Sequence, residues 1–298
     1  MDGIIVIYKE KDWTSFDVVA KLRGIFHEKR IGHGGTLDPM AEGVLPVFVG
    51  KSARACDMLP CEEKEYVAGF ELGMTSDTLD ITGKVSKKKQ TSFTKNEFCA
   101  ACGKFVGDIL QIPPMYSAIK INGKKLYDLA REGKTVEREP RPVTVYEIEV
   151  LDFCEKTQTG KMRVKCKKGT YIRSIIDDLG KELGCGAVMT SLERIASAGF
   201  FKADALRISQ VEEIFNRGEI ENVLMNVEKA FDKAYEGRVF LSERLTHLYK
   251  NGVKLSVGQE GLVVKNQSET MLAYGREGEF LGLCCECDGV IKQVKNFY

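Results

Sequence analysis

The chain has 298 residues, of which 43% are hydrophobic and 29% are charged, and its formal net charge is +1. This composition is typical of a globular protein with two domains, or with one large domain and an appendage. No apolar stretch approaches the roughly 18 residues that a membrane span needs, and the first residues lack a signal-peptide pattern. We therefore expect a cytoplasmic protein with no membrane partner.

The first 200 residues predict alternating strands and helices. A buried strand at 3–8 precedes a helix that begins at Thr14 or Ser15 and runs to about residue 27. A glycine-rich loop at 32–43 leads into a strand at 44–50, where Pro46 suggests an edge or an irregular start. Four apolar residues at helical spacing mark the first helix, namely Phe16, Val19, Leu22 and Phe26. Further strands are expected at 65–73, 143–153, 160–167 and 187–198, and further helices at 94–106, 171–183 and 209–217.

Two regions depart from this alternation. Residues 112–141 predict a hairpin-like excursion, with two short runs around an Asn122–Gly123 turn and a short helix that ends at Gly133. From about residue 236, short segments separated by glycines predict a small all-β barrel. We therefore expect a mixed α+β domain over 1–235 and a small β domain over 236–298.

Ten cysteines are too few for a disulfide scaffold, and we expect mostly reduced thiols in the core. Cys99 and Cys102 form a CxxC pair, and Cys284, Cys285 and Cys287 form a CCEC run that lacks ordinary zinc-site spacing. We expect no metal at either place.

Basic residues concentrate in two segments of this nearly neutral chain. Residues 161–173 contain six basic residues and no acidic one, and residues 120–141 contain seven basic and four acidic residues. A locally basic surface fits a partner that carries phosphates. A solvated strand face explains the first segment equally well.

The loop GHGGTLDPMAEG places one histidine and one aspartate among glycines. A phosphate cradle is excluded, because GVLPVFVGKS has six residues between its glycine and GKS where a P-loop has four. The sequence also lacks the HExxH, GxSxG and HxE…PCxxC patterns, which disfavours metal-assisted or serine hydrolysis and zinc deamination. Asp38, followed by Pro39, then has two readings: a plain turn, or a catalytic carboxylate held by an arginine.

The same loop resembles the catalytic loop of the TruB family of bacterial tRNA pseudouridine synthases. Five further segments resemble the family in the same order: EYVAGFELGMTSDTLDITG, IPPMYSAIKINGKKLYDLAREG, RPVTVYEIEV, KGTYIRSIIDDLG and GCGAVMTSLERIASAGF. The resemblance covers residues 3 to about 200 and weakens beyond them. It implies an α+β pseudouridine synthase fold with a mixed, largely antiparallel central sheet flanked by helices, and a C-terminal PUA-like RNA-binding domain.

The implied activity is the isomerisation of uridine 55 in the T loop of tRNA, by base flipping and by cleavage and re-formation of the glycosidic bond. No metal, cofactor or guide RNA is implied. The expected partner is tRNA, through its T arm and, for the C-terminal domain, its acceptor stem, and the expected state is a monomer. Two alternatives stay open: a tRNA-binding chaperone with dispensable catalysis, and a guide-RNA-dependent relative.

The resemblance also implies roles for particular residues. Asp38 is the catalytic aspartate, either as nucleophile at the sugar or as a base that starts elimination, and Arg173 pairs with it. Tyr66 stacks on the flipped uracil and assists proton removal, while His33 enters the space that the nucleotide vacates. Tyr171, Lys9, Asp80 and Leu192 line the pocket or its approach. Residues 112–141 clamp the T loop, with Lys120, Lys124, Lys125 and Arg131 as expected phosphate contacts.

Overall fold

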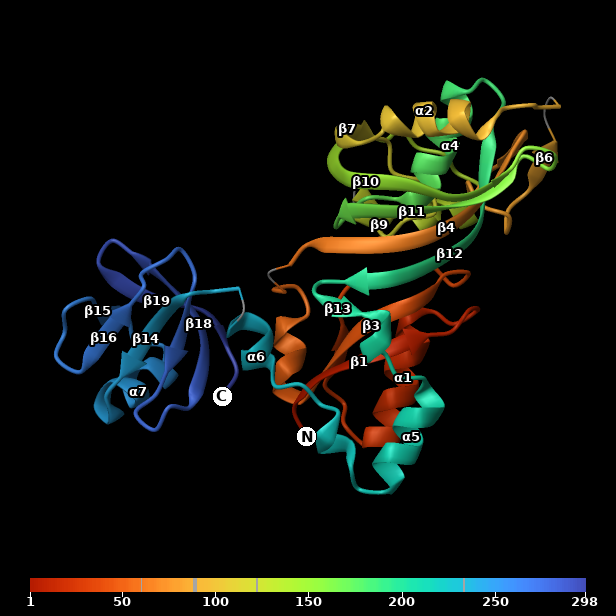
Figure 1. The fold of residues 1–298 in the computed structure, drawn as a ribbon. Helices are drawn as coiled ribbons and strands as arrows, with labels where there is room; N and C mark the ends of the chain where they lie inside the picture. The colour runs from red at the N-terminus through yellow and green to blue at the C-terminus, as the bar shows by residue number, and fades with distance from the viewer. Residues whose placement is uncertain (60, 88–89, 122, 233) are drawn as a thin grey trace.

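The computed structural model describes residues 1–59, 61–87, 90–121, 123–232 and 234–298, and its core is a nine-stranded sheet (Figure 1). Its main path runs β1-β3-β12-β4-β11-β10-β7, with β2 beside β3 and β13 beside β12. The pairings are antiparallel except where β12 meets β3. The predicted mixed, largely antiparallel sheet is therefore confirmed.

Every strand and helix predicted in this part is present close to its predicted range, but five short strands (31–33, 74–76, 85–87, 107–111 and 200–201) were not predicted. Its strands are β1 (Gly3–Lys9), β2 (Ile31–His33), β3 (Glu42–Val49), β4 (Glu63–Leu72), β7 (Gly107–Gln111), β10 (Arg141–Cys154), β11 (Thr159–Lys167), β12 (Ala187–Ser197) and β13 (Phe200–Phe201), with a separate hairpin of β5 (Met74–Ser76) and β6 (Val85–Lys87). Its helices are α1 (Ser15–Phe26), α2 (Lys95–Gly103), α4 (Ile172–Glu182) and α5 (Ile208–Asn216), with a 3₁₀ turn η1 (Gly50–Ala55).

Two apolar clusters join these helices to the sheet. Side chains of α2 and α4 pack on β4, β10, β11 and β12, where Phe70 and Phe98 stack with ring centroids 4.4 Å apart. Side chains of α1 and α5 pack on β1 and β3 in the second cluster. In α1 the predicted stripe is confirmed for Val19, Leu22 and Phe26, whereas Phe16 is 62% exposed. The buried face of α1 includes Val18 instead, which packs in the cluster over β1 and β3.

Pro46 does not mark an edge strand, contrary to the expectation. β3 lies between β1 on one side and both β12 and β2 on the other. β12 pairs with β3 at 42–43 and β2 pairs at 47–49, so Pro46 falls between these two partners. Its carbonyl accepts a hydrogen bond from Gly34 N at 2.8 Å. A missing N–H costs little at that gap, so an interior strand tolerates the proline.

The C-terminal strands form a second sheet of six strands, which curls into a half-barrel (Figure 1). It contains β14 (Gly237–Leu241), β15 (Leu255–Ser256), β16 (Leu262–Lys265), β17 (Met271–Tyr274), β18 (Phe280–Cys287) and β19 (Val290–Asn296). The expectation of an all-β region is wrong, because helix α7 (Glu243–Lys250) follows β14. Leu245 and Tyr249, four residues apart, bury one face of α7 in this sheet's core.

Helix α6 (Val227–Asp232) lies between the two sheets (Figure 1). Phe231, on α6, is fully buried in a cluster that includes Ile4 of β1 and Leu283 of β18. Its ring centroid is 5.9 Å from that of Phe297. Arg54 of η1 also donates to Asn296 Oδ1 at 2.7 Å. The two sheets therefore meet in one shared apolar cluster, beside the clusters that each sheet has of its own.

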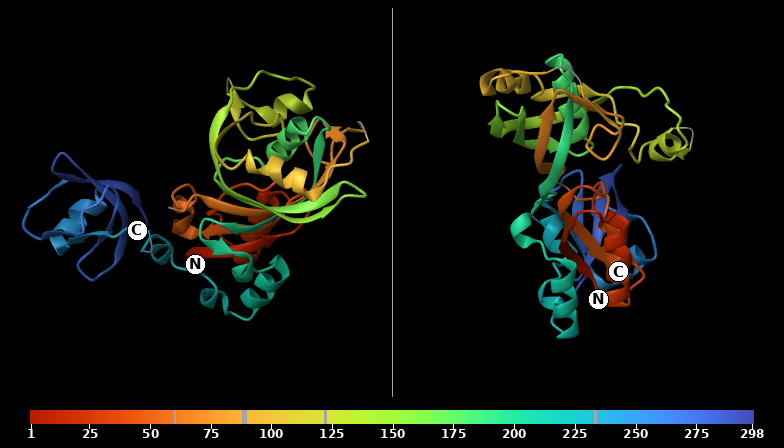
Figure 2. Two further views of the ribbon diagram at one scale, coloured as in Figure 1. Left: turned by 45° about the horizontal axis from the view of Figure 1, so that its top comes forward. Right: turned by 90° about the vertical axis from the view of Figure 1, so that its right-hand side faces the viewer.

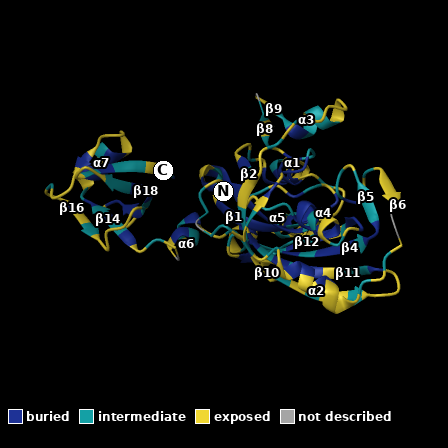
Figure 3. Cartoon of the chain, turned by 90° about the horizontal axis from the view of Figure 1, so that it is seen from above, coloured by how far each residue is buried: buried dark blue, intermediate teal, exposed yellow. Residues whose placement is uncertain are grey.

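The excursion at 112–141 stands away from the main sheet (Figures 2 and 3). It contains β8 (Lys120–Ile121), β9 (Lys124–Lys125) and α3 (Leu126–Arg131), as the sequence predicts. Asn122, the first residue of the predicted turn, lies outside the described residues. Most of the excursion is intermediate or exposed. Its first residue, Ile112, is tied to α4, because its carbonyl accepts a hydrogen bond from Ser174 Oγ at 3.3 Å.

Candidate active site

A cavity of about 250 Å³ opens where the 32–43 loop, β4, the start of α4 and the root of the excursion meet. Five residues predicted from the sequence line it: Asp38, Tyr66, Tyr171, Arg173 and Leu192. They come from four separate segments of the chain. The fold therefore brings together most of the predicted pocket residues.

The central feature of the cavity is an ion pair between Asp38 and Arg173. Arg173 Nη2 lies 2.9 Å from Asp38 Oδ2, although 134 residues separate the two in the sequence. The Arg173 side chain is 5% exposed and that of Asp38 is 37% exposed. The carboxylate therefore faces the cavity, while the guanidinium lies behind it.

Arg173 is held by groups other than Asp38. Its Nη1 donates to Thr78 O at 3.1 Å and lies 3.6 Å from Asp80 Oδ2, and its Nη2 donates to Tyr116 O at 2.9 Å. Asp80 is 3% exposed, and its Oδ1 accepts hydrogen bonds from Thr78 and Thr82. Asp80 thus supports Arg173 from behind and does not line the cavity, which corrects one expectation.

The electrostatics of Asp38 combine two opposed effects. Burial raises the pKa of the Asp38 carboxyl, and the neighbouring Asp80 adds to that rise. Arg173 and Lys9 act in the opposite direction, because both cations favour the ionised form. Arg173 also fixes the direction of the carboxylate, since it contacts one oxygen and leaves the other to the cavity.

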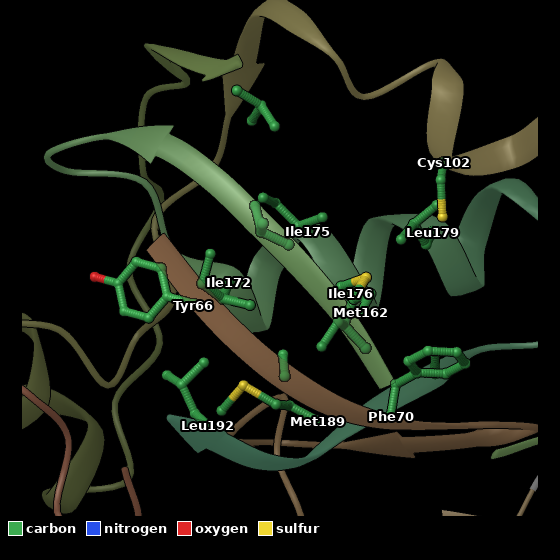
Figure 4. Close-up of a cluster of buried hydrophobic side chains, with 14 of the residues drawn as sticks. Tyr66, Phe70, Cys102, Met162, Ile172, Ile175, Ile176, Leu179, Met189 and Leu192 are labelled. Carbon is green, nitrogen blue, oxygen red and sulfur yellow. The ribbon is translucent and has the colours of Figure 1, made fainter. Parts of the chain in front are cut away.

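Tyr66 forms the aromatic wall of the cavity. Its side chain comes from β4, and its hydroxyl points away from the other apolar side chains of the cluster (Figure 4). Burial raises the pKa of Tyr66 to about 12, although Arg194 beside it acts to lower that value. The hydroxyl is therefore protonated at neutral pH.

Tyr171 and Leu192 complete the predicted wall. Tyr171 precedes α4, where Gln111 of β7 holds its backbone by two hydrogen bonds, from Tyr171 N at 2.8 Å and to Tyr171 O at 3.0 Å. Gln111 is 2% exposed and has no local signal in the sequence. Leu192 of β12 lies close to Tyr66 in Figure 4. An apolar side chain and two rings thus surround the carboxylate.

Lys9 and His33 are not on the cavity wall, which corrects the expectation for Lys9. Lys9 is fully buried and donates to Trp13 O at 2.6 Å and to Pro39 O at 3.3 Å, so it holds the chain next to Asp38 from behind. Burial lowers the pKa of Lys9 to about 8. His33 pairs with Val47 in the β2–β3 ladder, and burial together with Arg194 lowers its pKa, so its imidazole is neutral.

The predicted basic surface at 161–173 is largely neutralised. Arg163 forms ion pairs with Glu65, Glu147 and Glu149, and Lys165 pairs with Glu63. Lys167 and Lys168 both contact Glu62. The acids come from the neighbouring strands β4 and β10 and from the residue before β4, which counting charges along a single segment cannot reveal.

In the excursion, Lys120 and Lys124 are exposed, but they lie outside the cavity wall. Lys125 and Arg131 both lie over the ring of Tyr127, 5.2 and 5.4 Å from its centroid. Ser117 and Ala118, at the root of the excursion, do line the cavity. The basic side chains of this segment therefore lie around the cavity rather than in it.

Two cationic residues near the cavity are missing from the sequence prediction. Arg194 is fully buried and donates to Val44 O at 2.8 Å, to Gly35 O at 3.1 Å and to Thr36 O at 3.4 Å. It thereby fixes both ends of the loop that carries Asp38. Lys64, two residues before Tyr66, lines the cavity itself. Neither residue has a motif of its own, although both lie within or beside segments that resemble the family.

The part of the chain that the structure describes contains no group of three or more histidine, cysteine or acidic side chains placed to hold a metal ion. Cys102 and Cys284 lie in apolar clusters, as expected for core thiols, whereas Cys99 and Cys287 are exposed and Cys285 is only partly buried, so the expectation holds for two of these five cysteines. No described helix is long and apolar enough to cross a membrane.

Two family models match adjacent parts of the chain. Residues 23–172 match the model described as "TruB family pseudouridylate synthase (N terminal domain)". Residues 173–232 match the model described as "tRNA pseudouridylate synthase B C-terminal domain". Together they cover the elements that form the cavity.

Curated relatives extend the similarity over nearly the whole chain. A protein of Clostridium novyi is 41% identical over 284 residues, which is 95% of each chain. A protein of Dehalococcoides mccartyi is 40% identical over 299 residues, covering 100% of this chain and 97% of its own. Both relatives are named tRNA pseudouridine synthase B.

Solved structures share the fold at lower identity. The chain superimposes on a protein in a Cbf5–Nop10–Gar1 complex with a TM-score of 0.75 and 25% identity, covering 99% of this chain and 85% of the other. A protein in an H/ACA ribonucleoprotein bound to a substrate RNA gives a TM-score of 0.73 at 23% identity, covering 99% and 85%.

Proposed function

This chain belongs to the TruB family of pseudouridylate synthases, and we propose that it converts uridine 55 in the T loop of tRNAs to pseudouridine. The observation that carries this proposal is the Asp38–Arg173 pair at 2.9 Å, in a cavity with an aromatic wall. A carboxylate held by an arginine stays oriented toward its substrate. The relatives' names support tRNA as the substrate.

The reaction breaks the N1–C1′ glycosidic bond, turns the uracil and joins its C5 to C1′. The proton on C5 leaves and N1 gains a proton, so no atom is gained or lost overall. Asp38 begins the reaction, either by attacking the sugar or by removing a proton from it. Both routes need an ionised Asp38, which Arg173 and Lys9 favour against the burial that raises its pKa.

A base within a folded T loop is stacked, so the enzyme must extrude it and supply replacement contacts. We assign the stacking contact to Tyr66, whose ring forms the cavity wall beside Leu192. Because its pKa is raised to about 12, the Tyr66 hydroxyl assists proton removal as a neutral hydrogen-bonding group. His33, neutral and part of the 32–43 loop, is assigned to the space that the flipped nucleotide leaves.

The T arm is expected to lie between the sheet and the excursion at 112–141. Lys120 and Lys124 are exposed there, as phosphate contacts require, and such contacts position the RNA without reading its sequence. We assign 1–235 to catalysis and 236–298 to a PUA-like module that holds the acceptor stem. The family resemblance supports a monomer, and the exposed lysines of the excursion support recognition of the substrate without a guide RNA.

An Asp38→Asn substitution tests the proposal. The amide keeps the size of the side chain, and Arg173 keeps its contacts with Thr78, Tyr116 and Asp80. We expect the variant to bind a T-arm hairpin with unchanged affinity and to form no detectable pseudouridine.

Binding of the hairpin is the control that separates loss of chemistry from loss of the fold. Pseudouridine formation by the Asp38→Asn protein at the wild-type rate would show that Asp38 is not the catalytic group. A chaperone with dispensable catalysis predicts that T-arm binding and the refolding of tRNA survive in the Asp38→Asn protein.

A further inference from the structure

Lys64 presents an ammonium group to the cavity from the beginning of β4. It lies two residues before Tyr66, so both side chains project from the same face of the strand. Both line the cavity together with Asp38. Lys64 Nζ also lies against the 32–43 loop, 3.0 Å from the point where a Cβ on Gly35 would stand.

The surroundings of Lys64 are positively charged. Arg194 Nη1 lies 3.7 Å from the same point above Gly35, and its field adds to that of Lys64. The nearby acids are used elsewhere: Glu63 contacts Lys165 at 2.9 Å, and Glu62 contacts Lys168 at 2.5 Å. Within the described residues, the Lys64 ammonium has no carboxylate partner and no hydrogen bond, whereas its backbone pairs with β11 and β12. This wall of the cavity therefore carries an unbalanced positive charge.

A backbone phosphate is the anion that a flipped nucleotide carries with it. Its base and its sugar are neutral, and the one acidic side chain among the described residues that line the cavity, Asp38, is already paired with Arg173. Arg194 cannot bind the phosphate directly, because it is fully buried and its guanidinium donates to three backbone carbonyls. Of these two cations, Lys64 is the one whose ammonium can donate a hydrogen bond to the phosphate.

We propose that Lys64 binds a phosphate adjacent to the flipped uridine, at a subsite whose field Arg194 strengthens. This inference rests on the proposed function and names a substrate contact within it. Lys64 then anchors the backbone on the side of the Asp38 loop, while Tyr66 contacts the base. Its role is to bind and position the RNA, and it takes no part in breaking the glycosidic bond.

The protonation of Lys64 gives this contact a pH dependence. Burial, with a contribution from Arg194, lowers the pKa of Lys64 to about 8. The groups that face it are Arg194 on β12, and Cys166 and Lys168 on and after β11. Cys166 has a pKa of about 11, so it stays neutral near pH 8. Since a phosphate favours the ammonium form, RNA affinity should fall as pH rises through about 8.

The test compares Lys64→Met and Lys64→Arg with wild-type protein, on a T-arm hairpin. Lys161→Met is the matched control, because Lys161 is an exposed lysine on β11, opposite Gly69 at the far part of the β4 ladder. Loss of one phosphate contact should reduce the slope of log affinity against log salt by about 0.7 to 0.9. We expect Lys64→Met to weaken binding about tenfold and to leave kcat within about twofold, since one charge-assisted hydrogen bond is lost.

We expect Lys64→Arg to bind like the wild type at pH 7 and to keep that affinity at pH 9, where the wild type binds more weakly. Lys9, which also has a pKa of about 8, is unchanged in both proteins and does not affect this comparison. Lys161→Met should retain the wild-type affinity and salt slope.

Hairpins with a neutral methylphosphonate on either side of the target uridine locate the contact. At one of these positions the modification should weaken the wild type but not weaken Lys64→Met further. Additive losses at both positions would overturn the inference, as would a fall in kcat with unchanged affinity and salt slope. Pseudouridine formation by the wild type on the unmodified hairpin is measured alongside. Its absence would overturn the proposed function instead.

Discussion

Arg194 shows how a single buried residue can organise the loop that carries Asp38. It is fully buried, and its guanidinium spans the carbonyls of Gly35, Thr36 and Val44. The backbones also meet closely, because a Cβ on Gly43 would lie 2.2 Å from Arg194 O. Gly43 has φ +108°, a conformation that favours glycine. The loop before β3 is thus fixed by a strand 150 residues away.

An Arg194→Lys substitution tests this role. Lysine offers one compact group where arginine offers a planar fork, so it cannot satisfy all three carbonyls. We expect the free energy of unfolding to fall by about 2 to 4 kcal/mol and kcat to fall with it. Urea denaturation and turnover on a T-arm hairpin measure the two effects.

Arg163→Lys is the matched control, because Arg163 forms its ion pairs at a partly exposed site on β11. There the same change should cost less than about 1 kcal/mol. Equal losses in the two variants would contradict the special role of Arg194.

Residues with a motif were easier to predict than residues that support them. Asp38 and Arg173 were identified by resemblance, and the fold places them in contact. Lys64 and Arg194 lie in ordinary strand sequences, where a basic residue indicates a solvated face. Their importance depends on contacts with the 32–43 loop, which no local pattern encodes. Lys9 was assigned to the cavity, but its ammonium donates to the carbonyls of Glu10, Trp13 and Pro39 and does not line the cavity.

At the scale of elements, the start of α1 holds the loop that carries Asp38. Thr14 and Asp17 form a capping box at this end of the helix. Ser15, the first residue of α1, accepts a hydrogen bond from Leu37 N at 2.9 Å and is 2% exposed. One helix end therefore fixes the residue just before Asp38.

A Ser15→Ala substitution separates this tether from the stability of the helix. It leaves the buried N–H of Leu37 without a partner, which should cost about 1 to 3 kcal/mol of stability. Because the loop then shifts, kcat should also fall severalfold, as measured on folded protein with a T-arm hairpin.

Thr14→Ala provides the comparison, since it removes the cap but leaves the contact between Ser15 and Leu37. Its stability should fall by about 1 kcal/mol while kcat stays at the wild-type value. If both variants kept full turnover, the tether would have no role in catalysis.

The element order was predictable because hydrophobic spacing and caps are local signals. The predicted helix at 171–183 corresponds to α4, and the predicted strand at 187–198 corresponds to β12. Pro46 and α7 were misread for opposite reasons. The position of Pro46 inside the sheet depends on how β2 and β12, which are distant in the sequence, share one side of β3. Helix α7 is short and lies among segments whose sequences are typical of strands.

At the scale of the whole molecule, the two sheets should unfold together. They share the cluster around Phe231, in which residues from β1, β3, β17 and β18 meet. Trp13, the only tryptophan, packs against the cluster beneath α1 and reports on the N-terminal part alone. Its fluorescence and the far-UV circular dichroism of the full chain should therefore change at the same temperature.

A Phe231→Ala substitution should lower the free energy of unfolding by about 3 to 5 kcal/mol, because it opens a cavity in the shared core. Phe16→Ala, at a ring that is 62% exposed, should change it by less than about 1 kcal/mol. Two separate transitions in the wild-type protein would show that the sheets are not coupled.

Mapping of pseudouridine in an unmodified tRNA transcript, incubated with the full chain and no guide RNA, tests the central claim most directly. Pseudouridine has the mass of uridine, so the RNA is derivatised with a carbodiimide before mass mapping. We predict one modified nucleotide, at position 55 of the T loop, and none after treatment with the Asp38→Asn protein. A transcript without pseudouridine, or one modified only elsewhere, would contradict the account.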